Sequence, residues 1–146
     1  MADIVTQAEY WNGEAGRRWA RNQRGIDAVF APLTAALFQD AALRPDSPVL
    51  DVGCGAGDCA VRASRELGAR GRVVAVDVSA PLLAVARERA AIDALGGAPI
   101  AFVEADAQSH DFGSAVFEHI ISRFGVMFFD DSVAAFANLR RALVPG

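Results

Sequence analysis

Three glycines at alternate positions, Gly53, Gly55 and Gly57, follow an apolar run that carries one acid, Asp51. Because glycine lacks a Cβ, it adopts positive φ and lets a ligand approach the backbone. The free N–H groups of a helix that starts after such a turn attract anionic groups. We therefore expect the glycine backbone to form the floor of a ligand site, in which Asp51 binds an ammonium or hydroxyl group. The alternative is a tight turn without a ligand.

The spacing of the glycines favours one kind of ligand over another. The dinucleotide fingerprint is G-x-G-x-x-G, and here Asp58 stands at the position of its third glycine. An acid at that turn repels a pyrophosphate. A ligand with an ammonium group is therefore the better match.

Two further acids each end an apolar run. Asp77 ends one run, and a carboxylate there can accept hydrogen bonds from both hydroxyls of a ribose, in NAD or in an adenosine-type ligand. Asp106 ends the next run, where it can accept a hydrogen bond from the amine of adenine. The alternatives are a turn or helix-capping residue for Asp77 and a solvated loop aspartate for Asp106.

Alternating strands and helices must position these acids. Apolar runs and helical spacing predict strands at 49–52, 72–78, 100–106 and 117–125, and helices at 58–67, 80–95 and from about 131. Nearly continuous apolar strands indicate parallel pairing with both faces covered, as in an α/β sheet. The mixed polar and aromatic pattern of the first 25 residues predicts one or two short helices. A further helix, with its main part starting near Pro32, follows them.

Composition narrows the class of protein. The 146 residues fit one domain, and a hydrophobic content of 53% is enough for a core. With 14 basic and 18 acidic residues, the net charge of -4 gives no electrostatic case for nucleic-acid binding. We expect no membrane span, no signal peptide and a cytoplasmic location. Cys54 and Cys59 lack a nearby pair of histidines, which favours free thiols and no metal site.

Five ordered stretches resemble the motifs of class I S-adenosylmethionine-dependent methyltransferases: VLDVGCGAGD, VVAVDVS, FVEADAQ, FEHIISRFGVMFF and NLRRALVPG. Within that class they are most similar to small-molecule enzymes such as the ubiquinone and menaquinone C-methyltransferases. The resemblance implies a Rossmann-like α/β/α sandwich over residues 48–146, with four strands in the order 3-2-1-4. It also implies an N-terminal helical segment, residues 1–47, that forms a lid.

The resemblance implies S-adenosylmethionine as cofactor, S-adenosylhomocysteine as product and a small-molecule methyl acceptor. The residues that it implies are Asp51, Gly53, Cys54, Gly55 and Gly57 around the methionine part, Asp77 on the ribose, Val78 against the adenine, Asp106 with Ala107 at the adenine amine, and Ser122 with Arg123 near the methionine carboxylate and the transfer site. Trp11 and Trp19 either cover the cofactor or pack against the first helix.

No residue is assigned as a catalytic base. Much of the rate gain can come from positioning, and a base is needed only if the acceptor must lose a proton. His110 lies in a loop, where it is solvated or faces the site, and His119, inside a strand, is expected to be a core or a satisfied histidine. The apolar residues of 124–129 either wall an apolar acceptor pocket or pack in the core.

The chain stops where the family typically continues into further strands, which would leave strand four at a sheet edge. We therefore expect a fragment, or a homo-oligomer that completes its sheet with a second copy. Two rival functions remain. An NAD-dependent oxidoreductase is allowed by Asp77 and disfavoured by Asp51 and Asp58. A non-catalytic cofactor-binding or self-associating module is the other.

Overall fold

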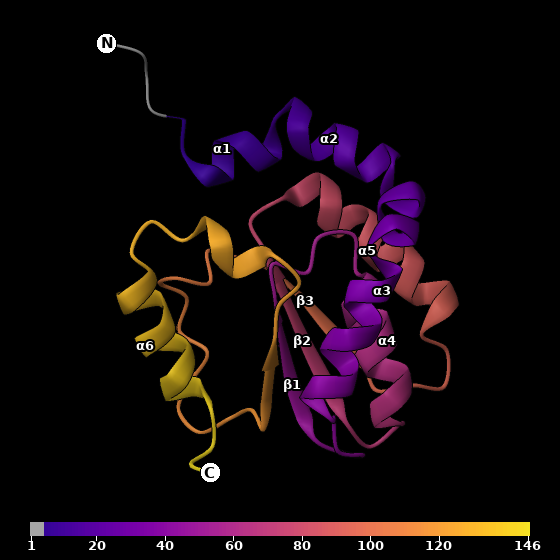
Figure 1. Cartoon of the computed structure of the whole chain (residues 1–146), viewed down its shortest axis with the longest axis vertical. Helices are drawn as coiled ribbons and strands as arrows, with labels where there is room; N and C mark the ends of the chain where they lie inside the picture. The colour runs from indigo at the N-terminus through magenta and orange to yellow at the C-terminus, as the bar shows by residue number, and fades with distance from the viewer. Residues whose placement is uncertain (1–4) are drawn as a thin grey trace.

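The computed structural model describes residues 5–146, and its centre is a four-stranded parallel sheet (Figure 1). The strands lie in the order β3-β2-β1-β4, and all three pairings are parallel. Their bounds are β1 Pro48–Val52, β2 Arg72–Asp77, β3 Ile100–Glu104 and β4 His119–Ile121. This confirms the predicted α/β fold class and the strand order 3-2-1-4.

The helices alternate with the strands as the sequence predicts. Their bounds are α1 Gln7–Asn12, α2 Glu14–Arg21, α3 Gln23–Ala41, α4 Asp58–Leu67, α5 Ala80–Asp93 and α6 Ser132–Ala142, with a short 3-10 helix η1 at Gly125–Phe128. Two short helices thus occupy the N-terminal stretch. No helix among residues 5–146 is long and apolar enough to cross a membrane.

Alternation along the strands builds three layers. Val49 of β1 packs on one face of the sheet with Phe38 of α3 and Leu67 of α4. The next residue, Leu50, points to the other face, where it packs with Leu139 of α6. Each β1 side chain named here is fully buried, so both faces of the sheet are covered.

Most predicted boundaries lie within two residues of those in the structure, and two differ by more, each for a local reason. β4 ends at Ile121 rather than at residue 125, because the Ser122 hydroxyl donates to the Val52 carbonyl and the chain turns at Phe124, whose φ is 68°. Helix α3 begins at Gln23, so Pro32 lies inside it. Pro32 is on the exposed side of the helix, where water can satisfy the carbonyl that the proline leaves free.

The N-terminal helices α1 and α2 lie across the end of the sheet at which the strands finish (Figure 1). The Asn12 side chain donates to the Val78 carbonyl at 2.7 Å and accepts from the Ala80 N–H at 2.8 Å. The Ser79 hydroxyl donates to the Trp11 carbonyl at 2.7 Å. These three bonds fix α1 to the loop that follows β2.

Candidate cofactor site

A cavity of about 560 Å³ lies between the carboxyl ends of the central strands and the N-terminal helices. Nine of the eleven predicted cofactor residues line it, namely Asp51, Gly53, Cys54, Gly55, Asp77, Val78, Asp106, Ala107 and Arg123. Trp11 and Trp19 line it from the opposite side. The structure therefore brings most of the predicted set together around one space.

The glycine loop bends over the end of β2. The N–H groups of Gly53 and Cys54 both donate to the Val76 carbonyl, at 2.9 and 3.0 Å. At Gly53 (φ 68°) a Cβ would lie 2.5 Å from the Cα of Gly125, so two backbones meet there. At Gly55 (φ 53°) a Cβ would meet nothing within 4 Å. Gly55 therefore forms open floor of the cavity.

Two predicted residues, Gly57 and Ser122, lie outside the cavity lining. Gly57 is the N-cap of α4 with φ 87°, and a Cβ there would lie 3.0 Å from the Cβ of Ala86. Its lack of a side chain permits the packing of α4 against α5. The Ser122 hydroxyl donates to the Val52 carbonyl at 2.8 Å and accepts from the N–H of Val126 at 3.2 Å.

Asp51 is a buried carboxyl group with one unsatisfied oxygen. It is 1% exposed, and its Oδ2 has no hydrogen-bond partner among residues 5–146. Burial raises the pKa of Asp51 to about 7, against the opposing effect of the Arg123 charge, and the negative charges of Asp77 and Asp58 raise it further. A ligand ammonium group would satisfy this oxygen, so the site fits the amino acid part of S-adenosylmethionine.

Asp77 is held rigidly by the backbone. Its two oxygens accept from the N–H groups of Gly55 at 2.8 Å and Ser79 at 2.9 Å. Burial raises the pKa of Asp77, and these hydrogen bonds act in the opposite direction. Each carboxylate oxygen has a further lone pair, so a ribose hydroxyl can still be accepted.

Asp106 is an exposed turn residue at the edge of the cavity. Its side chain accepts from the N–H of Gln108 at 2.9 Å, which is an Asx turn, and the residue is exposed. It also lines the cavity. A solvated turn aspartate thus stands at the edge of the space where a ligand base could reach it.

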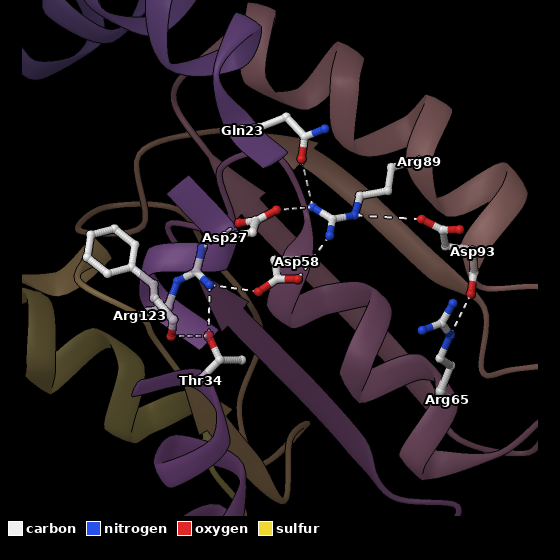
Figure 2. A network of polar contacts seen from close by, with 9 residues as sticks. Gln23, Asp27, Thr34, Asp58, Arg65, Arg89, Asp93 and Arg123 are labelled. Atoms are coloured by element: carbon white, nitrogen blue, oxygen red, sulfur yellow. Dashed lines mark hydrogen bonds and ion pairs between the residues drawn. The ribbon is translucent and has the colours of Figure 1, made fainter. Parts of the chain in front are cut away.

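An alternating cluster of charges lies beside the glycine loop (Figure 2). Arg123 donates to Asp58 at 2.7 Å, to Asp27 at 3.1 Å and to the Thr34 hydroxyl at 2.8 Å. Arg89 bridges the same two carboxylates, at 2.6 Å to Asp27 and 2.9 Å to Asp58. The cluster joins α3, α4, α5 and the loop after β4. The Arg123 guanidinium is therefore occupied by protein carboxylates at the cavity wall.

Asp27 and Arg89 belong to this cluster and were not predicted from the sequence. Asp27 lies three residues before Phe30, on the same side of the helix, and this spacing was the available signal for an inward-facing charge. Arg89 stands in the charged run ARERA, and nothing in the sequence distinguishes it from its neighbours. Asp58 was interpreted only as a residue that disfavours a pyrophosphate, whereas its side chain pairs with both arginines.

Aromatic side chains cover the cavity. Trp11 contacts Trp19 edge-to-face at 5.7 Å between ring centroids, and it contacts Phe128 at 5.5 Å. All three line the cavity, together with Phe30, Phe124, Met127 and Phe129. Both tryptophans therefore cover the cavity and pack against each other. These aromatic residues and Met127 make much of the cavity lining apolar.

Neither histidine lines the cavity. His110 packs on the ring of Phe112 at 4.7 Å. His119 lies in β4, and its Nε2 is buried without a hydrogen-bond partner among the described residues, so of the two predicted alternatives the satisfied histidine is wrong for this atom. Cys54 and Cys59 are buried free thiols.

Sequence comparison finds a methyltransferase family. A family model described as a methyltransferase domain matches residues 49–146. The ubiquinone/menaquinone biosynthesis C-methyltransferase UbiE of Marinomonas sp. (strain MWYL1) is 34% identical over 104 residues, which cover 71% of this chain and 41% of that protein. UbiE of Shewanella halifaxensis (strain HAW-EB4) is 33% identical over 109 residues, covering 75% and 43%. The chain thus spans about two fifths of these relatives.

Solved structures show the same fold. Phosphoethanolamine N-methyltransferase 2 of Haemonchus contortus, in complex with S-adenosyl-L-methionine, matches with a TM-score of 0.81 and 23% identity over 99% of this chain and 34% of that one. The [4+2]-cyclase SpnF matches with a TM-score of 0.69 and 24% identity over 79% and 41%. Together with the family match and the relatives above 30% identity, this fold establishes that the chain belongs to the class I S-adenosylmethionine-dependent methyltransferases.

Proposed function

We propose that this chain is the cofactor-binding part of an S-adenosylmethionine-dependent methyltransferase that acts on a small molecule. The observation that carries the proposal is the buried Oδ2 of Asp51, which has no hydrogen-bond partner among residues 5–146, together with the open floor at Gly55. A carboxylate of this kind attracts a cation rather than a pyrophosphate. This separates the site from that of an NAD-dependent oxidoreductase, for which the comparisons give no support.

In this proposal the three acids hold three parts of one ligand. Asp51 accepts from the ammonium group, Asp77 accepts from the ribose hydroxyls, and Asp106 accepts from the adenine amine. Val78 and Ala107 pack on the adenine. Cys54 and the loop glycines surround the methionine part. Arg123 contributes positive charge at the cavity wall while it stays paired with Asp27 and Asp58.

When bound, S-adenosylmethionine supplies an activated methyl group on its sulfonium. The chain's own contribution is alignment of the acceptor and exclusion of water. The aromatic cover of Trp11, Trp19 and Phe128 performs the second task over this cavity. An apolar cover suits an apolar ring as acceptor, and the related UbiE proteins carry a name that places them in quinone biosynthesis. The cytoplasmic location remains a prediction.

Calorimetric titration with S-adenosylhomocysteine tests the cofactor site. We expect binding to the wild-type chain, weakening in Asp77→Ala and no heat with NAD. Asp40→Ala, which removes an exposed carboxylate of α3, is the matched control and should bind as the wild type does. Absence of binding by a chain with a cooperative thermal transition would contradict the proposal, as would a preference for NAD.

A non-catalytic module is the second candidate, because the chain spans only about two fifths of its relatives. It predicts S-adenosylhomocysteine binding without methyl transfer. Incubation with radiolabelled S-adenosylmethionine and quinol-type acceptors distinguishes the two. Transfer of label to an acceptor supports the enzyme, and tight binding without transfer supports the module.

A further inference from the structure

A groove of about 650 Å³ lies on the outside of the elbow between α2 and α3. Its lining includes Trp19, Arg21, Arg24, Ile26, Val29 and Phe30. Trp19 and Phe30 also line the cofactor cavity, so these two side chains form the wall between the cavity and the outer groove. The groove therefore lies next to the cavity, on the solvent side of its cover.

The groove and the helix beside it are basic, and Arg21 and Arg24 line the groove. Residues 14–25 contain four arginines and one acid, Glu14, which pairs with Arg17 and Arg21. Arg18 and Arg24 are exposed and form no ion pair with any of residues 5–146, and the pair of Arg21 with Glu14 is itself exposed to solvent. The chain as a whole carries a net charge of -4, so this local positive charge stands against an acidic background. Such a distribution attracts an anionic surface to one side of the molecule.

Exposed apolar side chains lie beside these charges. Val29 is 74% exposed and Leu33, one turn later on α3, is 50% exposed. The ring of Trp19 is partly exposed at the same elbow. Arginines next to a tryptophan and aliphatic side chains are the composition of an interfacial membrane surface, where the cations meet headgroups and the apolar groups enter the acyl boundary.

We propose that the α2–α3 elbow docks on the surface of an anionic lipid bilayer. Arg18, Arg21 and Arg24 contact the lipid headgroups, and Trp19 and Val29 insert at the boundary of the acyl region. The acidic remainder of the chain is repelled by the same surface, which fixes the orientation. Docking in this pose sets the Trp19–Phe30 wall of the cavity against the bilayer. The docking does not depend on the proposed methyl transfer.

Sedimentation with vesicles tests the proposal on the full chain. We expect binding to vesicles that contain phosphatidylglycerol and little binding to pure phosphatidylcholine. Each basic residue at an anionic surface is worth about a fivefold change in partition coefficient. The double variant Arg18→Glu/Arg24→Glu should therefore lose at least about 25-fold, and Val29→Asp should also weaken binding. Salt should weaken the wild-type interaction.

Two matched controls come from α6. Arg140→Glu, compared with Arg24→Glu alone, makes the same charge change at an exposed site outside the groove. Val133→Asp makes the same apolar-to-acid change as Val29→Asp at a residue that is 81% exposed. Both should bind vesicles as the wild type does. In a Trp11→Phe chain, brominated lipid should quench the fluorescence of Trp19. The proposal is overturned if the folded wild type does not bind anionic vesicles, if the controls lose binding equally, or if Trp19 is not quenched. S-adenosylhomocysteine titration of the same samples reports separately on the cofactor site.

Discussion

At the scale of single residues, Asp51 sets the most distinctive expectation. Its pKa is raised to about 7 by burial, so its carboxyl group is largely neutral in mildly acid solution. An ammonium ligand needs the ionised form, and binding therefore improves as the pH rises through 7. We expect the association constant of S-adenosylhomocysteine to fall about tenfold per pH unit below about pH 7. Calorimetry across this range measures it.

The raised pKa of Asp51 makes the free energy of unfolding fall as the pH rises, whereas ligand binding improves. The folded pKa of Asp51 lies above the unfolded value of 3.8, so the folded chain binds more protons between these values. Its contribution to stability is fully present below the unfolded pKa and is lost as the pH rises through 7.

Asp51→Asn should bind the ligand weakly at every pH, with a flatter pH dependence. A binding profile unchanged by Asp51→Asn would remove Asp51 from the site.

The glycines of the loop make a second pair of expectations. Gly53→Ala forces a methyl group against the backbone of Gly125, so we expect a large loss of stability, of about 2 kcal/mol or more. Gly55→Ala costs only the positive φ, about 1 kcal/mol, because its Cβ enters open space. That space is the proposed ligand site. Urea unfolding should therefore rank Gly53→Ala as the less stable variant.

Titration with S-adenosylhomocysteine completes this comparison. Gly55→Ala should remain folded and bind the ligand much more weakly than the wild type. If Gly55→Ala binds normally, the ligand does not approach the backbone there. If Gly53→Ala is as stable as the wild type, the close approach to Gly125 is not a constraint on the fold.

At the scale of elements, the cluster of Arg123, Arg89, Asp27 and Asp58 joins pieces that are far apart in the chain (Figure 2). The two arginine side chains are 16% and 20% exposed, so water screens the pairs only partly. Asp27→Ala leaves both arginines with one carboxylate fewer. We expect a loss of about 2 kcal/mol in unfolding free energy, less than for a fully buried pair.

A double-mutant cycle separates coupling from packing. Asp27→Ala, Arg89→Ala and the double variant should show an interaction energy of at least about 0.5 kcal/mol, because the side chains share one network. The exposed pair of Arg70 with Asp46 provides the comparison and should contribute close to nothing. Additive losses at Asp27 and Arg89 would mean that the cluster is four independent contacts.

The elements show why sequence patterns predict strands better than ionic clusters. The runs that became β1 and β2 are apolar on both faces, and this local pattern alone predicts buried parallel strands. The end of β4 could not be predicted from such a pattern, because a hydrogen bond from the Ser122 hydroxyl to the Val52 carbonyl ends the strand. The partners of Asp58 lie 31 and 65 residues away, and no local pattern encodes such pairings.

Among the site residues, too, local patterns predict the position in the fold, and long-range packing decides the contacts. Asp51, Gly53, Gly55 and Asp77 belong to strand ends, so the order of elements was enough to bring them together. Gly57 belongs to the same motif in sequence, but the packing of α4 on Ala86 decides its role. Motif membership therefore predicted where these residues lie and did not predict what each one contacts.

At the scale of the whole molecule, β4 lies at one edge of the sheet. The C-terminal segment covers only the approach to this strand, where Phe117 forms a bridge with Leu143 and its carbonyl accepts from Val144. The sequence-based hypothesis that this edge mediates self-association stays a prediction. Sedimentation velocity over a range of concentrations should show a growing dimer fraction. A monomer at all concentrations would contradict it.

Ligand binding should stabilise the chain as one unit, because the cavity is formed jointly by the sheet and the N-terminal helices. A ligand that binds only the folded state adds about 2.7 kcal/mol when its concentration is about 100 times Kd. For a domain of this size that amounts to a rise of about 5–10 °C in Tm. S-adenosylhomocysteine should produce this shift in the wild type and a much smaller one in Asp77→Ala, while NAD should produce none.

Hydrogen exchange at single segments tests whether the N-terminal helices α1 and α2 take part in ligand binding. α1 is fixed to the loop after Asp77 by Asn12, and Trp11 and Trp19 line the ligand cavity from above. Hydrogen exchange in α1 and α2 should therefore slow when the ligand binds, together with exchange in the glycine loop. In Asn12→Ala, slowing should persist in the loop and diminish in α1. Equal slowing of α1 in both chains would show that the cover closes without the Asn12 contacts.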